Sequence, residues 1–188
     1  MKKIEIEEAK LRKAFQEGGS ELKEGLVELF GEELFKSKVF DPESVEWVDL
    51  GLPSGRLWAK ENAEGLYTYD EAVGAFGKYL PKGAAMAELI EECQVEWNSK
   101  KKGLDVTGPN GNSIFLPAAG YRDLGGNLCN VGEEGDYWTS MPYAHSKSFA
   151  PLSQAIARNL YFHSGNVHPL INSRRANGFS VRPSRELN

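Results

Sequence analysis

The sequence predicts an α+β fold with an antiparallel sheet, and three observations support this expectation. Short segments with alternating apolar and polar residues occur before and after a central pair of helical segments. Gly- and Pro-rich turns separate the strand segments, as in antiparallel hairpins. The strands are grouped around the helices instead of alternating with them, which indicates α+β and not a parallel α/β sheet. The 188 residues, 40% of them hydrophobic, are enough for one domain and a small appendage.

Residues 1–40 are expected to form a short helical segment ahead of this domain. Apolar residues recur at helical spacing up to Gly18-Gly19, and again after Ser20, which is a good N-cap. Two helices this short cannot bury a core alone. We therefore expect them to pack on the main domain, on each other in an oligomer, or on a carrier protein. Attachment to a carrier and a simple structural lid both remain open interpretations.

The main domain is expected to span residues 41–188 and to begin with a hairpin. Residues 45–52 alternate apolar and polar side chains and are predicted to form its first strand. The turn Pro53-Ser54-Gly55 separates this strand from a second one at residues 56–59.

Two helices are predicted after the hairpin. Thr68 and Glu71 have the spacing of a capping box, which starts a helix that ends before Pro81. A second helix is predicted over residues 84–97, with one apolar face. That face comprises Met86, Leu89, Ile90, Cys93 and Trp97.

The remaining chain is predicted to contain further strands joined by long loops. Residues 108–112 read as a hairpin turn, followed by a strand at 113–117. Later strands are expected at 137–140, 157–162 and 179–182. Loops this long inside a domain usually carry function. The large aromatic residues assigned to the core are Trp58, Trp97, Phe115, Trp138, Phe162 and Phe179.

The segment 137–185 differs in composition from the rest of the chain. It has no Asp or Glu, contains all three histidines and carries six Lys or Arg residues, whereas the whole chain has a net charge of −5. Tyr, Ser, Asn and Arg are the residues that dominate binding surfaces. The segment is therefore predicted to form a recognition surface. Six cations spread this thinly, without a run, do not favour a nucleic-acid partner.

The sequence also bears on redox state, metal binding and localisation. Cys93 and Cys129 have no zinc-binding spacing, and either free thiols or one disulfide would fit them. No secretory signal follows Met1, so the chain is expected to be made in the cytoplasm. The sequence contains no run of eighteen apolar residues, so no membrane span is predicted.

Four motifs in register resemble one family. Residues 48–59 (VDLGLPSGRLWA), 111–122 (GNSIFLPAAGYR), 137–140 (YWTS) and 178–183 (GFSVRP) resemble the Fibrobacter succinogenes major paralogous domain. That family is similar to C-type-lectin-like domains, including the variant related to the formylglycine-generating enzyme. The resemblance covers about residues 45–185 and implies a C-type-lectin-like fold of that variant for the main domain.

A narrower resemblance lies within residues 159–183, which are similar to the variable region of proteins diversified by retroelements. It implies a variable region at about 143–177. Tyr161 and His163 alternate with Leu160 and Phe162, so one face of a strand is free to vary while the other holds the core. The implied ligand-binding residues are, first, Tyr161, His163, His168, Leu170, Ile171, Asn172, Ser173 and Arg174, and second, Tyr143, His145, Ser146 and Arg158.

The resemblance implies a ligand-binding display protein, with a protein or glycan on a target cell surface as its partner. The N-terminal helices would attach it to a carrier such as a phage tail, and assembly into a phage particle fits the missing secretory signal. A homo-oligomer is a further expectation. Leu170 and Ile171 are expected to be exposed, as apolar contacts of a binding patch.

Other functions fit the sequence less well. A calcium site needs clustered oxygen ligands, and the acid-free segment offers no carboxylate. No serine or cysteine nucleophile lies in a recognisable motif, and the paired cysteines of formylglycine-generating enzymes are absent, so no enzyme activity and no cofactor are expected. A structural virion or surface protein remains an alternative, although it leaves the unusual composition of the tail unexplained.

Overall fold

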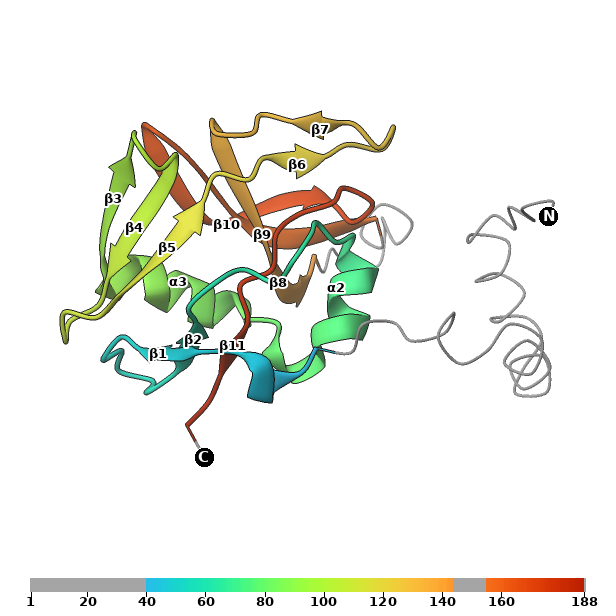
Figure 1. Ribbon diagram of the computed structural model, residues 1–188. Helices are drawn as coiled ribbons and strands as arrows, with labels where there is room; N and C mark the ends of the chain where they lie inside the picture. The colour runs from blue at the N-terminus through green and yellow to red at the C-terminus, as the bar shows by residue number, and fades with distance from the viewer. Residues whose placement is uncertain (1–39, 144–154, 188) are drawn as a thin grey trace, which may run out of the picture. The chain divides into compact units, whose positions relative to one another are not determined.

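A computed structural model describes residues 40–143 and 155–187 (Figure 1). This part of the chain is a mixed α+β domain with antiparallel sheets and two α-helices, which confirms the predicted fold class. The helical segment predicted for residues 1–40 lies, except for Phe40, outside the described residues. Residues 144–154 of the predicted variable region, with His145 and Ser146, also lie outside them.

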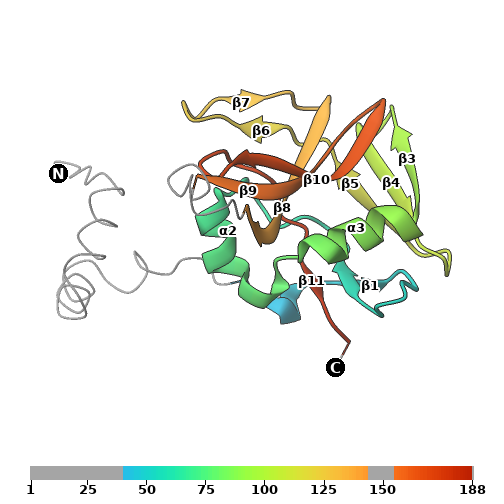
Figure 2. The same ribbon diagram turned by 180° about the vertical axis from the view of Figure 1, so that it is seen from behind.

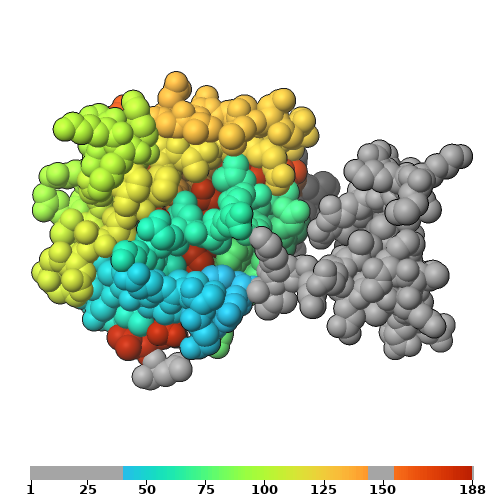
Figure 3. Space-filling view, viewed as in Figure 1, coloured from blue at the N-terminus to red at the C-terminus, as the bar shows by residue number. Residues whose placement is uncertain are grey.

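The first sheet joins the two ends of the described domain. A 3₁₀ turn at Pro42–Ser44 leads into β1 (Trp47–Asp49), which pairs with β2 (Leu57–Ala59) as the predicted hairpin. On its other edge, β2 pairs with β11 (Ser184–Arg185). The space-filling view shows the result, with C-terminal residues in red beside the first described segment in blue (Figure 3).

The two predicted helices are present, with one boundary corrected. The capping box forms at α2 (Tyr69–Phe76), and a 3₁₀ turn follows it at Gly77–Tyr79. The second helix, α3 (Gly83–Glu92), ends five residues earlier than predicted, and β3 (Gln94–Asn98) replaces its last turn. Cys93 is already extended, and pairing of β3 with the next strand outweighs the helical spacing of the apolar residues.

None of the helices in the described ranges is both long and apolar enough to cross a membrane.

The second sheet contains a strand that the sequence did not reveal. Strand β4 (Gly103–Thr107) lies between β3 and β5 (Ser113–Pro117), and the predicted turn at residues 108–112 connects the last two. A short hairpin of β6 (Tyr121–Arg122) and β7 (Leu128–Cys129) follows.

The third sheet has the order β10-β9-β8 and is wholly antiparallel. It consists of β8 (Glu134–Pro142), β9 (Ile156–His163) and β10 (Asn166–Arg174). The predicted strands at 137–140 and 157–162 are thus confirmed within longer ones. Residues 166–174, in which no strand was predicted, form an edge strand. The strand predicted at residues 179–182 is absent, since Phe179 and Ser180 make only isolated bridges and residues 181–182 make none.

Helices cover this third sheet on both faces (Figures 1 and 2). On one face, α3 closes a core that includes Tyr137, Leu160 and Phe162. On the other, α2 closes a second core around Trp138 and Ala157. Of the aromatic residues assigned to the core, four are buried. Trp97 and Phe115 are only partly buried, and they lie on β3 and β5 of the second sheet.

Arg182 ties together the segments that carry the four sequence motifs. Its side chain is fully buried and donates hydrogen bonds to the backbone carbonyls of Ala59, Lys60 and Phe115. Its Nε donates to Asn62 at 2.8 Å, and the Asn62 amide in turn donates to the Tyr137 hydroxyl at 3.0 Å. These motifs therefore build the framework on which the third sheet rests.

Candidate functional site

Cross-strand pairing assembles a polar surface at one end of the third sheet. Residues directly opposite each other on neighbouring strands share a face. Glu134 of β8 is opposite His163 of β9, which is opposite Asn166 of β10. Tyr161 is likewise opposite His168 of β10. We call this surface the histidine face, and it comprises Glu134, Tyr161, His163, Asn166 and His168.

Tyr161 lies at the centre of the histidine face. Its ring stacks on that of His168, with centroids 6.2 Å apart and planes at 20°, and it contacts His163 at 5.8 Å. The Tyr161 hydroxyl donates to the Glu134 carboxylate at 3.2 Å. Partial burial and the charge of Glu134 raise the pKa of Tyr161, so its hydroxyl stays protonated as a donor. The arrangement offers flat rings and polar edges, which suits a binding surface.

His163 has a defined orientation at the end of β9. The backbone N–H of Gly165 donates to His163 Nδ1 at 3.2 Å, which fixes Nδ1 as an acceptor. In the neutral ring, Nε2 then carries the proton. A local turn therefore sets the direction of the imidazole without help from a distant segment.

A buried carboxylate lies beneath this surface. Asp136 is 4% exposed and accepts a hydrogen bond from Asn159 Nδ2 at 2.8 Å. Burial, reinforced by the charge of Glu134, raises the pKa of Asp136 to about 7. The Asn159 Oδ1 atom is buried with no hydrogen-bond partner among the described residues. This pair adds a titrating group just below the surface.

The structure separates Arg158, Asn172 and Arg174 from the histidine face. Arg158 is opposite Asn172, and their register places them on the other face of the sheet, as it does Arg174. There the Arg158 guanidinium lies 6.0 Å from the ring centre of Tyr143. The predicted binding residues thus form two surfaces, one on each side of β9 and β10.

The expectation that Leu170 and Ile171 are exposed is wrong, since both are half-buried. A register shift between His168 and Ile171 displaces this part of β10. An ideal Cβ on Gly83 would lie 3.2 Å from Leu170, so that side chain packs on the start of α3. Ile171 and Ser173 lie opposite Asn159 and Ala157, towards the α2 side.

Sequence reasoning missed Glu134 and Asn166 of the histidine face, and Asp136 beneath it. The two acids precede the acid-free segment, and only the pairing of β8 with β9 brings them beside Tyr161 and His163. The pattern Glu134-Gly-Asp136 before a strand was visible, but its register with β9 was not.

Among residues 40–143 and 155–187, no cluster of three or more His, Cys, Asp or Glu side chains is arranged to hold a metal ion. Cys93 and Cys129 are free thiols, and burial raises the pKa of Cys93 to about 11. What the surface can do chemically is stack rings and exchange hydrogen bonds.

Comparison with protein-family models, with curated proteins and with solved structures found no match to this chain. Function is therefore inferred from the side chains described above and from the motifs in the sequence.

Proposed function

We propose that this protein is a ligand-binding display protein with a C-type-lectin-like domain whose C-terminal surface is diversified by a retroelement. The ligand is a protein or glycan on a target cell surface. The N-terminal segment attaches the domain to a carrier, such as a phage tail. The proposal includes no catalysis and no cofactor.

One observation carries the proposal: the last four residues of β9 alternate between buried and partly exposed side chains. Leu160 and Phe162 are fully buried, whereas Tyr161 and His163 point to the histidine face. Substitution of such surface residues usually changes stability by less than about 0.5 kcal/mol. A framework of this kind tolerates many sequences at its surface while its core stays constant.

The physical state of the histidine face also suits binding. Its side chains project from paired strands, not from an unsupported loop, so they are held in place before a ligand arrives. Each side chain immobilised on binding costs roughly 0.5–1.5 kcal/mol, and prior ordering reduces that cost. Tyr and His rings stack on sugars and on apolar side chains alike, which fits a surface whose ligand changes with its sequence.

Sequencing the DNA around the gene tests the diversification. We expect a reverse transcriptase gene nearby and a second, near-identical copy of the segment that encodes residues 143–177. The two copies should differ only at adenines of the second copy. A genomic neighbourhood with neither feature would contradict the proposal and favour the alternative, a structural virion or surface protein without a diversified site.

A further inference from the structure

A cleft of about 370 Å³ lies away from the histidine face, between the first sheet and the two helices. It is bounded by the 3₁₀ turn after α2, the start of α3, and the segment that includes β11. Four cationic side chains and two carboxylates line it. These are Arg56, Lys78, Lys82 and Arg185, with Glu43 and Glu186.

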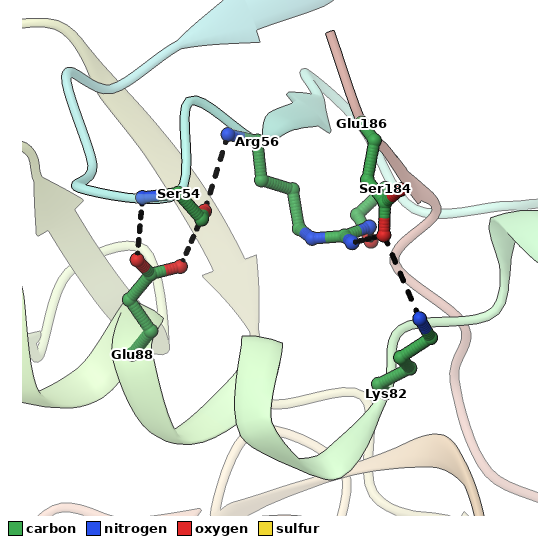
Figure 4. Close-up of polar contacts among 6 residues, drawn as sticks. All are labelled: Ser54, Arg56, Lys82, Glu88, Ser184 and Glu186. Atoms are coloured by element: carbon green, nitrogen blue, oxygen red, sulfur yellow. Dashed lines mark hydrogen bonds and ion pairs between the residues drawn. The ribbon is translucent and has the colours of Figure 1, made fainter.

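Arg56 supplies a buried cation to the wall of this cleft. The residue is 7% exposed, and its Nη1 donates to the Ser184 hydroxyl at 3.1 Å (Figure 4). Its backbone N–H donates to the Ser54 hydroxyl, which donates in turn to Glu88 at 2.6 Å. Ser184 thus holds the guanidinium, while Ser54 and Glu88 hold the backbone of the same residue, and Arg56 lines the cleft.

In the described part of the chain, the only carboxylate bonded to Arg56 is that of Glu186, and a carboxylate from another molecule can replace it. Glu186 accepts from Arg56 Nη2 at 2.7 Å and lies 3.6 Å from Lys82 Nζ (Figure 4). Yet the Glu186 side chain is 68% exposed, and that of Lys82 is 73% exposed. The Lys82–Glu186 pair, exposed on both sides, contributes little, typically below about 1 kcal/mol. In the Arg56–Glu186 pair the Arg56 side chain is buried, but the Glu186 carboxylate is open to solvent. A carboxylate from another molecule can therefore compete with Glu186 for the buried guanidinium.

The start of α3 adds to the attraction for an anion. No side chain caps this helix, its first turn contains no acid, and Lys82 at the N-cap position lines the cleft. The first N–H groups of a helix, together with its dipole, favour negative charge. A second hollow, which shares Arg56 and Lys82 with the cleft, is lined as well by Ser54, residues 84–85 and Glu88, and the Glu88 carboxylate is occupied by Ser54.

We propose that the cleft around Arg56 and Lys82 binds a glutamate or aspartate side chain of an extended acidic peptide. In the free protein, Glu186 occupies the position of that carboxylate. The peptide class follows from the present occupant, which is a glutamate on the chain directly after β11. The chain as a whole has a net charge of −5, so long-range attraction to an acidic peptide is absent and binding must come from this local site.

Fluorescence anisotropy of the full-length chain with a labelled hexaglutamate peptide tests the proposal, with hexaglutamine as the matched neutral probe. We expect hexaglutamate to bind, hexaglutamine not to bind, and added salt to weaken the complex. The Glu186→Gln variant should bind hexaglutamate about 2–5-fold more tightly, because its competing carboxylate is removed. The Lys82→Gln variant should bind it about 2–5-fold more weakly.

Lys100→Gln is the control, because it makes the same change of charge at an exposed position in the turn between β3 and β4. It should bind hexaglutamate as the unmodified chain does. Equal weakening by Lys100→Gln and Lys82→Gln would overturn the site, as would a lack of effect of Glu186→Gln. Binding of glucuronate without binding of hexaglutamate would overturn the peptide class.

Discussion

At the scale of single residues, Arg182 is the framework position with the most demanding surroundings. It is fully buried, and its guanidinium reaches three backbone carbonyls and Asn62 at once. Burial lowers the pKa of Arg182, and the surrounding acceptors compensate its charge. A lysine has no planar group that satisfies such a set.

We therefore expect Arg182→Lys to lower the free energy of unfolding by at least about 2 kcal/mol, since buried acceptors would lose their donors. Arg174→Lys, at an exposed position of β10, should change it by less than about 0.5 kcal/mol. Urea denaturation of both variants measures the difference. Equal stability of the two would show that Arg182 does not hold the motifs together.

Asp136 makes stability depend on pH. Its pKa rises from 3.8 to about 7 in the folded chain, so the folded state holds a proton that the unfolded state has released. Stability contributed by this group is therefore lost as pH rises from about 4 to about 7. We expect Asp136→Asn to flatten this decline in urea denaturation curves measured across that range. Glu133→Gln, at an exposed position, should leave the decline in place.

At the scale of elements, the pairing of β8 with β9 depends on a glycine. Gly135 lies opposite Phe162, and an added Cβ would lie 2.2 Å from the phenyl ring. We expect Gly135→Ala to destabilise the fold by about 1–3 kcal/mol. Gly74→Ala in α2, where nothing lies within 4 Å of the new methyl, should instead stabilise by about 0.5–1 kcal/mol. Thermal unfolding separates the two, and a tolerated Gly135→Ala would contradict the packing described.

Strand β9 should respond differently on its two faces. We expect His163→Ser combined with His168→Ser to change the free energy of unfolding by less than about 1 kcal/mol, because His168 is exposed and the half-buried His163 belongs to neither core. Phe162→Ala should cost about 3–5 kcal/mol, because its ring is fully buried. A large loss in the histidine variant would show that the histidine face belongs to the core.

At the scale of the whole molecule, local sequence patterns predicted the individual helices and strands better than they predicted which strands pair. The hairpin turn at 108–112 and the capping box at Thr68 depend on neighbouring residues and were found correctly. Helical spacing misassigned Trp97, because the strand it occupies is set by pairing with Leu104, several residues away. Strand β4 was missed for the same reason.

The candidate site shows the same limit. The alternation around Tyr161 and His163 was readable because it lies within one strand. The half-burial of Leu170 could not be predicted from the sequence, because it depends on a register shift in β10 and on contact with α3. The separation of Asn172 and Arg174 from His168 also arises from that shift, which no local pattern encodes.

Sequencing this gene from sibling strains tests most directly whether a constant framework carries a variable surface. We expect amino-acid substitutions to concentrate at the surface positions of β9 and β10, namely Tyr161, His163, His168, Asn172 and Arg174. The buried framework residues Tyr137, Leu160, Phe162 and Arg182 should stay unchanged. Substitutions spread evenly along residues 40–187, or sibling genes identical throughout residues 143–177, would contradict the account.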